Sequence, residues 1–551
     1  MSHPGTGPAP PPEAVGPLIR GLAVLRVLSA AGGRLSAGEL ARATGLARST
    51  VDRALSTFDR LGLLRAEGRD AVLAPPLMEL GNAYLAASRL PRLLGPLADR
   101  LAAELDESVS LAVPDGDGAR FVHQAVRRRS VSLAFRVGDL VPAERGAPGA
   151  LFASAWTHDE WEQWRRRRAA DPTDSGFPAV PAGDGGDHAF AERVALAAER
   201  GWAADGELIE PGLIAVAVPV HDACGLQVCA LSVVSHTSRH DTDSLAAAVL
   251  PRLRETAQRM ERALAAPTPP AAGAPAPAAA TAANRASKQE LGPEFVESLA
   301  RGIAVLTVFG EGREALPLTT VAEASGLPRA TARRALFTLR HLGYVAADGS
   351  LFRPTPRVLE LGFAALSGLT LPGIARHHLA ELVELVHDSA SMAVLDGDDI
   401  RYVARVPTVR IMRVDITVGT RFPAYATAMG RVLYAGLPEE ERGPRLAGIR
   451  LDPLTPHTVT APERLAALVE ETGRQGHALV NDELEEGLRS LAVPVHDPAG
   501  RVVAAVNISM HSARRTPEQA LDELLPPLRR TARHIEGDLR VAGRFTAVPL
   551  S

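Results

Sequence analysis

The sequence predicts an α+β fold in which a winged helix-turn-helix and a sensor-type α/β domain occur twice in tandem. Three observations predict it: the chain repeats itself, each copy opens with helical patterns that end in a hairpin, and each continues with alternating strand and helix patterns. The length of 551 residues agrees with this division, because one hydrophobic core seldom serves more than about 300 residues.

The repeat runs without gaps over long stretches. At a shift of 281 positions, 12 of 23 residues are identical between Leu40–Gly62 and Val321–Gly343. Farther along the shift is 275, where Leu213–Asp222 aligns with Leu488–Asp497. A unit of about 260 residues is therefore used twice, which excludes a solenoid of short repeats. The Ala/Pro-rich stretch between the copies predicts a semi-rigid linker.

Three helices open each copy. In the first copy, leucines at helical spacing form the first helix, Ser36 is suited to cap the second, and Gly45 marks the turn before the third. The third helix has Val51, Leu55 and Phe58 on one face. A hairpin with Glu-Gly or Asp-Gly at its turn follows each third helix, which completes a winged helix-turn-helix.

A major groove accepts one helix, and forked or short polar side chains read base edges there. We therefore expect double-stranded DNA as a partner. The expected contacts lie on the third helices and the hairpins: Arg48, Ser49, Thr50, Arg53, Arg69, Arg329, Thr331, Arg333, Arg334 and Arg353.

Local charge supports this expectation although the whole chain carries only −4. Residues 46–66 carry four arginines and two aspartates, whereas residues 327–347 carry four arginines and no acid. The second module is thus expected to bind DNA more strongly. The alternative is a solvated charged face on a winged helix that contacts proteins.

Behind each winged helix the pattern predicts a longer helix and then an antiparallel sheet with helices packed on it. Hairpin turns such as Asp115–Gly118 join neighbouring strands. The strand candidates are Ser108–Val113, Arg120–Gln124, Val131–Val137, Ile214–Val220, Val228–Val234, Ser391–Leu395, Arg401–Val406, Ile411–Val418, Leu491–Val495 and Val502–Ser509.

The composition argues against several other classes. Two cysteines, Cys224 and Cys229, supply neither a disulfide framework nor a zinc site, and the longest apolar stretches of about eight residues are too short for a membrane span. No nucleophile-elbow, zinc or phosphate-loop motif occurs. We expect a cytoplasmic protein that is not an enzyme, with no catalytic residue, cofactor or metal. The run Arg165–Arg168 is interpreted as a solvated helix face.

Motifs in the second copy carry a family resemblance. Val418–Arg431 reads VGTRFPAYATAMGR, Asn481–Val495 reads NDELEEGLRSLAVPV, and Arg501–Ser509 reads RVVAAVNIS. With them the chain resembles the IclR family of bacterial transcription regulators, twice over and across nearly its whole length. The opening FVESLARGIAVL, Phe295–Leu306, is similar to the branch that controls aromatic-acid catabolism through the β-ketoadipate route.

The resemblance implies a winged helix joined by a linker helix to a GAF-like effector domain that binds small organic acids. It also implies self-association through both kinds of domain on near-palindromic operators. Arg410, Arg413 and Arg489 are candidate partners of a ligand carboxylate, with plain solvent exposure as the alternative. Carried over by motif, the effector contacts are Ala428, Met429, Asp482, Ser490, Asn507 and Ser509.

The first copy departs from this pattern. Glu207 stands for Asp482, Ala215 for Ser490, and Ser232 and Val234 stand for Asn507 and Ser509. Because polar positions are lost, the first cavity is interpreted as binding something else or nothing, and the second domain as the sensor.

The predicted organisation has six segments. They are a disordered tail (1–17), winged helix-turn-helix 1 (18–88), a linker helix with GAF-like domain 1 and a degenerate pocket (89–264), an Ala/Pro-rich linker (265–290), winged helix-turn-helix 2 (291–369), and a linker helix with GAF-like effector-binding domain 2 (370–541).

The function expected from these features is DNA-binding transcriptional regulation in response to a small organic acid, for which the branch resemblance suggests an aromatic one. The two fused units would act as a covalent pseudo-dimer. Two alternatives stay open: a co-regulator whose winged helices contact proteins, and a GAF-like enzyme.

Overall fold

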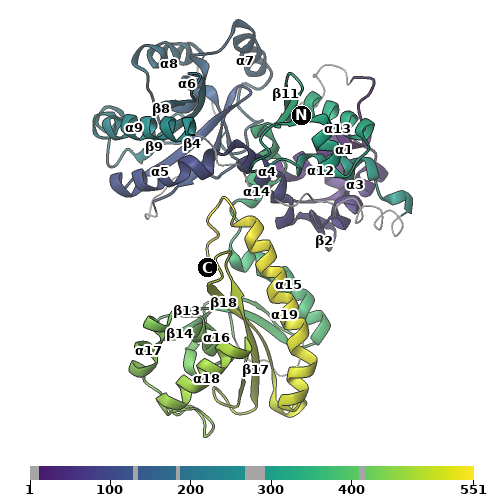
Figure 1. The fold of residues 1–551 in the computed structure, drawn as a ribbon, viewed down its shortest axis with the longest axis vertical. Helices are drawn as coiled ribbons and strands as arrows, with labels where there is room; N and C mark the ends of the chain where they lie inside the picture. Colours follow the sequence, from purple (N-terminus) through teal and green to yellow (C-terminus); the bar gives the residue numbers. More distant parts are fainter. Residues whose placement is uncertain (1–10, 128–134, 182–186, 267–291, 409–415) are drawn as a thin grey trace. The chain divides into compact units, whose positions relative to one another are not determined.

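The structure is a computed structural model, and it describes residues 11–127, 135–181, 187–266, 292–408 and 416–551 (Figure 1). The chain divides into two compact units, Met1–Gly368 and Leu369–Ser551. The first unit contains both winged helices and the first sensor-type domain, and the second unit contains the other sensor-type domain. The fold is therefore α+β, as the sequence predicts.

Both winged helices have the predicted order of elements. The first consists of α1 (Gly16–Ala30), β1 (Arg34–Ser36), α2 (Ala37–Thr44), α3 (Arg48–Arg60), β2 (Leu64–Glu67) and β3 (Asp70–Leu73). The second consists of α11 (Glu297–Leu306), β10 (Leu316–Pro317), α12 (Leu318–Ser325), α13 (Arg329–His341), β11 (Val345–Asp348) and β12 (Leu351–Pro354). Each has a three-stranded antiparallel sheet, in the order β1-β3-β2 or β10-β12-β11.

Local chemistry explains why these helices begin and end where they do. Ser36 and Glu39 form a capping box at the start of α2, which satisfies two backbone N–H groups. Gly45 has a φ of 68°, a left-handed conformation that glycine adopts without strain and that lets α3 follow at once. Val51 and Phe58 are fully buried on the predicted inner face of α3, whereas Leu55, also predicted there, is half-buried.

The two winged helices pack on each other inside the first unit. Leu18 of α1 lies over Gly302 of α11, and Leu299 of α11 lies over Gly21 of α1; a Cβ atom on either glycine would meet the leucine at 2.4–2.5 Å. The two contacts are therefore reciprocal: in each of them, a leucine from one copy packs on a glycine from the other copy. Glycine at both positions allows the two helices this close an approach.

Two hydrogen bonds extend this reciprocal arrangement. The backbone N–H of Val15 donates to Thr338 Oγ1 at 3.0 Å, and that of Val296 donates to Thr57 Oγ1 at 2.9 Å. The residue before each first helix is thus held by the third helix of the other copy. The tail predicted over residues 1–17 is too long, because α1 already begins at Gly16; residues 1–10 lie outside the described part of the chain.

The first sensor-type domain is a six-stranded antiparallel sheet with helices. Its strands are β4 (Ser108–Asp115), β5 (Gly118–Ala125), β6 (Leu140–Pro142), β7 (Ala203–Gly206), β8 (Leu213–His221) and β9 (Gln227–His236), in the order β6-β5-β4-β9-β8-β7. Its helices are α5 (Leu90–Leu105), α6 (Ala147–Ala153), α7 (His158–Ala170), α8 (Asp187–Arg200) and α9 (Thr242–Ala265), and α4 (Met78–Ser88) precedes them.

The second sensor-type domain repeats this topology. Its strands are β13 (Ser389–Asp396), β14 (Asp399–Val406), β15 (Arg421–Pro423), β16 (Ala478–Asn481), β17 (Leu488–His496) and β18 (Val502–His511), in the order β15-β14-β13-β18-β17-β16. Its helices are α15 (Leu371–Val386), α16 (Ala428–Ala435), α17 (Glu439–Gly448), α18 (Pro462–Gln475) and α19 (Pro517–Ala542), and α14 (Phe363–Leu366) ends the first unit.

Helices lie on both faces of each sheet. In the second domain α15 and α19 pack together on one face, as Figure 1 shows in green and yellow. On the other face, α16 and α18 share a buried apolar cluster with inward residues of the sheet. Two strand predictions, Val131–Val137 and Ile411–Val418, fall largely outside the described residues.

Candidate effector cavities and DNA-contacting surface

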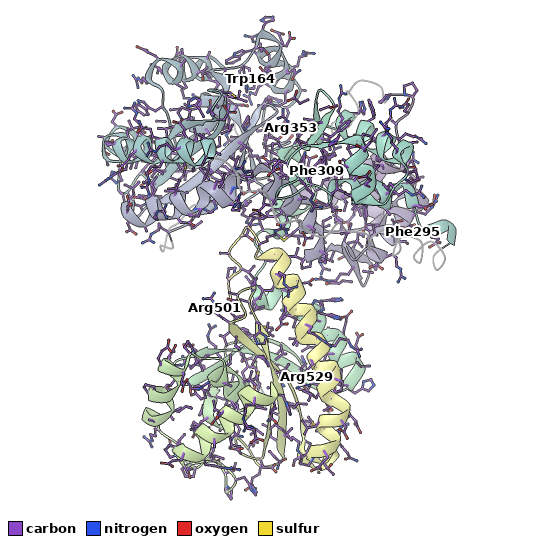
Figure 2. All side chains as sticks on the ribbon, in the orientation of Figure 1. Trp164, Phe295, Phe309, Arg353, Arg501 and Arg529 are labelled. Atoms are coloured by element: carbon purple, nitrogen blue, oxygen red, sulfur yellow. The ribbon has the colours of Figure 1, made fainter. Side chains whose placement is uncertain are left out.

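The side chains predicted to contact DNA lie on α3, α13 and the two hairpins. The arginines at 48, 53, 69, 329, 333, 334 and 353 and Ser49 are all exposed, whereas Thr50 and Thr331 are half-buried. Figure 2 labels Arg353 on the second hairpin. The predicted surface therefore exists on each winged helix, and DNA contact by these ten residues stays a prediction.

Several of these arginines have a partner within the chain. Arg48 Nε donates to Asp52 Oδ1 at 2.9 Å on the same helix. Arg333 Nη2 lies 3.5 Å from Glu13 Oε2, and Arg334 Nε donates to the carbonyl of Glu13 at 3.3 Å. Such exposed contacts are weak, so a DNA phosphate oxygen could replace Asp52 or Glu13 as the partner of these arginines.

A small cavity lies in the second sensor-type domain, between α16 and the sheet. Five of the six residues that the family motif assigns to the effector line it: Ala428, Met429, Ser490, Asn507 and Ser509. Apolar side chains and Thr427 complete the wall: Tyr402, Ile416, Ala426, Val480, Leu484 and Leu488.

The hydroxyl and backbone N–H groups of this cavity can donate hydrogen bonds, while Asn507 Oδ1 is a buried acceptor with no hydrogen-bond partner among the described residues. Asn507 Nδ2 donates to Ser490 Oγ and to Ser509 Oγ, both at 2.8 Å, so each hydroxyl keeps its own O–H for another acceptor. Thr427 caps α16 by accepting from the N–H of Gly430, and the N–H groups of the first two residues of α16 cannot pair within the helix. The set suits a carboxylate.

Asp482 does not line this cavity. Its Oδ1 accepts from the backbone N–H of Gly487 at 2.7 Å, and its own φ is 57°, so it shapes the turn between β16 and β17. Arg489 also points elsewhere, because its Nε donates to Asn481 Oδ1 at 2.7 Å. Arg410 and Arg413 lie outside the described residues.

An equivalent small cavity lies in the first sensor-type domain. Its lining comes from the aligned positions, but Ala215 and Val234 stand where the second cavity has serines. Asp205 stands where the second has Val480, and Phe135 stands where it has Ile416. The two cavities therefore share their position in the fold and differ in chemistry.

Asp205 is a site residue that the sequence analysis misses. It is 4% exposed, and its Oδ2 accepts from the backbone N–H of Ala147, the first residue of α6, at 2.6 Å. Burial raises the pKa of this carboxyl from 3.8 to about 7. Among the described residues, Oδ1 has no hydrogen-bond partner. A sequence signal exists, since a carboxylate replaces valine in an otherwise apolar stretch.

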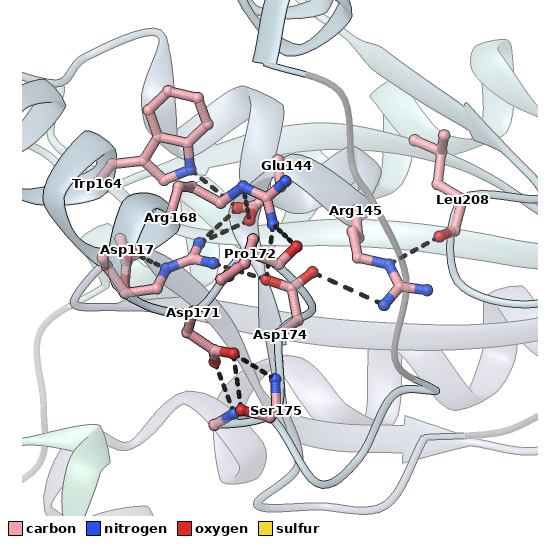
Figure 3. Close-up of polar contacts among 12 residues, drawn as sticks. Asp117, Glu144, Arg145, Trp164, Arg168, Asp171, Pro172, Asp174, Ser175 and Leu208 are labelled. Atoms are coloured by element: carbon pink, nitrogen blue, oxygen red, sulfur yellow. Dashed lines mark hydrogen bonds and ion pairs between the residues drawn. The ribbon is translucent and has the colours of Figure 1, made fainter. Parts of the chain in front are cut away.

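Beside this cavity lies a buried ion cluster that corrects one prediction (Figure 3). Arg167 and Arg168 of α7 are not on a solvated face: Arg167 Nη2 donates to Glu144 Oε1 at 2.7 Å, and both arginines bind Asp174. Trp164 Nε1 also donates to Glu144, at 3.0 Å. The prediction of a solvated face is therefore wrong for Arg167 and Arg168, because their side of α7 contacts Glu144 and Asp174. Arg165 and Arg166 lie outside the cluster.

Neither a metal site nor a membrane span is found in the described residues. No group of three or more His, Cys, Asp and Glu side chains there could hold a metal ion, and no described helix is long and apolar enough to cross a membrane. Burial raises the pKa of the Cys229 thiol to about 12, whereas Cys224 is exposed.

Two family models match this chain, each of them twice. The model described as Bacterial transcriptional regulator IclR C-terminal matches residues 82–262 and 363–537. The model described as IclR helix-turn-helix domain matches residues 17–68 and 298–349. Together they cover both winged helices and both sensor-type domains.

Similar proteins include two curated regulators and one solved structure. The Pca regulon regulatory protein of Pseudomonas putida is 40% identical over 271 residues, covering 49% of this chain and 93% of that protein. The p-hydroxybenzoate hydroxylase transcriptional activator of Acinetobacter baylyi is 34% identical over 255 residues, covering 45% and 94%. A transcriptional regulator from Rhodococcus sp. RHA1 is 51% identical, covering 45% and 100%, with a TM-score of 0.45.

Proposed function

Because the chain belongs to the IclR family of bacterial transcriptional regulators, we propose that it binds an aromatic acid in its second effector domain and thereby controls its two winged helices on DNA. It is an IclR-type DNA-binding transcriptional regulator with effector domains, and this family is one of regulators, not of enzymes. The aromatic acid and the paired use of the winged helices are the parts proposed.

The second cavity carries the proposal. Its polar groups, Ser490, Ser509 and the N-terminal N–H groups of α16, can all donate to one anion, and no described Arg, Asp or Glu side chain lines it. The remaining wall is apolar or aromatic, as a ring requires. Ala428, Met429, Ser490, Asn507 and Ser509 are the proposed effector contacts; Asp482 is proposed to hold the turn behind them.

The names of two relatives direct the choice of ligand. One is a regulatory protein of the Pca regulon, and the other activates p-hydroxybenzoate hydroxylase. We therefore take p-hydroxybenzoate as the first probe.

The test is calorimetric titration of the full chain with p-hydroxybenzoate. We expect one site per chain, and at least tenfold weaker binding in the double variant Ser490→Ala, Ser509→Val, because two donors to the carboxylate are lost. These substitutions give the second cavity the residues that the first already has, so they suit the fold. As a control, Ser512→Ala, outside the cavity, should bind as the wild type does. Unchanged affinity in the double variant would refute the proposal.

The paired winged helices support a covalent pseudo-dimer. The reciprocal contacts of α1 with α11, and of Val15 and Val296 with the opposite third helices, lie within one chain. One chain therefore presents two winged helices to one operator, and association through winged helices takes place inside the molecule. Association between chains is proposed to use the effector domains.

A further inference from the structure

The first effector cavity contains an ionisable carboxyl group, whereas the polar side chains that line the second cavity are neutral. In the second cavity, the N–H of Ala428 is proposed to bind the carboxylate of an acid ligand. In the first cavity, the N–H of the aligned residue, Ala147, already donates to the Asp205 carboxyl. A protein carboxylate thus lies where the proposed acid effector would place its own. A second carboxylate at this position would meet a like charge and would find that N–H taken.

The other oxygen of this carboxyl is a buried acceptor in a residue that lines the cavity. Asp205 lines the space, is almost completely buried, and its Oδ1 has no hydrogen-bond partner among the described residues. Burying such an acceptor without a partner costs free energy that a donor would recover. The cation that acts on it electrostatically is Arg193 of α8, whose Nη2 donates to the carbonyl of Glu144 instead.

The rest of the wall fits an aromatic ring. Phe121 and Phe135 are stacked with ring centroids 4.4 Å apart and planes 7° apart. Apart from Asp205 and Ser232 the lining is apolar or glycine, and the Ser232 hydroxyl is engaged with that of Ser110 at 2.9 Å. A ligand ring would extend this aromatic wall.

We propose that the first cavity is a second ligand site, specific for an aromatic amine that lies along Phe121 and Phe135 and donates to Asp205 Oδ1. An ammonium or amine N–H makes a charge-assisted hydrogen bond to the carboxylate, whereas an aromatic acid is repelled. The regulator would then respond to two chemically different compounds, one in each domain. The chemistry of the first site stands independently of the acid proposed for the second.

The full chain contains its own reporter for this site. All four tryptophans, at positions 156, 161, 164 and 202, belong to the first repeat, and the second repeat has none. Trp164 and residues of the cavity wall share one buried cluster. Tryptophan fluorescence therefore follows the first domain while calorimetry counts all sites.

The probes are benzylamine, benzyl alcohol and benzoate at pH 8. We expect a saturable fluorescence change with benzylamine, at least tenfold weaker binding of benzyl alcohol, and no saturable change with benzoate. In Asp205→Val, which copies Val480, benzylamine affinity should fall at least tenfold and benzoate should gain a response. Asp205→Asn keeps an acceptor for the N–H of Ala147 but removes the charge, so it should also weaken benzylamine binding. This variant replaces Asp205→Val in the test if the valine variant does not fold.

Two controls separate this proposal from the acid site. The double variant Ser490→Ala, Ser509→Val should leave the benzylamine response unchanged, whatever it does to p-hydroxybenzoate binding. Phe135→Ile, which copies Ile416, should weaken benzylamine several-fold through the lost ring contact. No saturable response to benzylamine, a response to benzoate in the wild type, or equal benzylamine affinity in both Asp205 variants and the wild type would each overturn the proposal.

Discussion

We predict that Asp205 makes the stability of the first repeat depend on pH. In the unfolded chain its carboxyl titrates near 3.8, whereas burial raises its pKa in the folded chain to about 7. The folded state therefore holds the proton more tightly between these values. The free energy of unfolding should fall as pH rises from about 4 to about 7, by roughly 4 kcal/mol if this group acts alone.

We predict that Asp205→Asn is more stable than the wild type at pH 8 and loses most of this dependence. The measurement is urea unfolding at pH 5 and pH 8, followed by tryptophan fluorescence. Asp243→Asn, which changes an exposed carboxylate on α9, should retain the wild-type pH dependence. A variant at position 205 that unfolds with the same pH dependence as the wild type would contradict the prediction.

Glu144 holds the buried ion cluster of the first repeat together. It is 1% exposed and accepts hydrogen bonds from Trp164 and Arg167. We predict that Glu144→Ala lowers the free energy of unfolding by about 3–5 kcal/mol, because buried cations lose their partner. Glu162→Ala removes an exposed pair with Arg165 and should cost less than about 1 kcal/mol. Chemical denaturation compares the two, and equal costs would argue against the buried role.

Which residues could be predicted depended on local pattern. The burial of Val51 and Phe58 on α3 and the capping role of Ser36 followed from spacing and side-chain chemistry. The roles of Asp205 and Glu144 did not, since hydrogen-bond partners 20 to 58 residues away in the chain decide whether these groups can be buried. Five of the six residues that the motif assigns to the effector line the second cavity, whereas the carboxylate of Asp482 accepts from Gly487 in the turn between β16 and β17.

At the scale of elements, the contact between α1 and α11 depends on two glycines. A Cβ atom on Gly21 would lie 2.5 Å from Leu299 Cδ1, so Gly21→Ala forces the two helices apart. We predict a loss of about 1–3 kcal/mol in the free energy of unfolding and weaker DNA binding. Thermal unfolding and DNA titration provide the measurements.

Gly537→Ala is the matched control for that substitution. Gly537 also lies inside a helix, α19, but a Cβ atom added there would have no neighbour within 4 Å among the described residues. Alanine at this position should therefore stabilise the helix by up to about 1 kcal/mol. If both alanine variants were equally stable and bound DNA equally well, the close approach of α1 and α11 would have no energetic role.

Long strands were easier to predict from the sequence than short ones. The central strands β4, β5, β8 and β9 and their counterparts each contain a predicted segment, because eight to ten residues give a clear apolar pattern. The edge strands β6, β7, β15 and β16 have three or four residues and give none. Since β7 carries Asp205, missing this strand also meant missing the carboxyl group of the first cavity.

At the scale of the whole molecule, two unlike winged helices in one chain predict unequal half-sites. Helix α13 and its surroundings carry more positive charge than α3 and its surroundings. We predict that Arg334→Ala weakens operator binding more than Arg53→Ala, and that each variant affects a different half-site, with centres about one helical turn or a multiple apart.

Footprinting on the region upstream of the regulator's own gene measures this, and titration at several salt concentrations counts the phosphate contacts. A control variant, Arg450→Ala, changes an exposed arginine of the effector domain and should bind DNA as the wild type does. A perfect palindrome that is equally sensitive to both arginine variants would contradict the prediction. No loss of binding in either would favour a regulator that contacts proteins.

The reciprocal packing of α1 and α11 also bears on how such a molecule can evolve. In a dimer of separate identical chains, every substitution changes both halves at once. If two different chains are made, a heterodimer forms in competition with two kinds of homodimer. Here the partners are always made together in equal number, so a substitution changes one half only. The differences between the two cavities, Ser490 and Ser509 in one and Asp205 in the other, are each encoded in one half of the chain only.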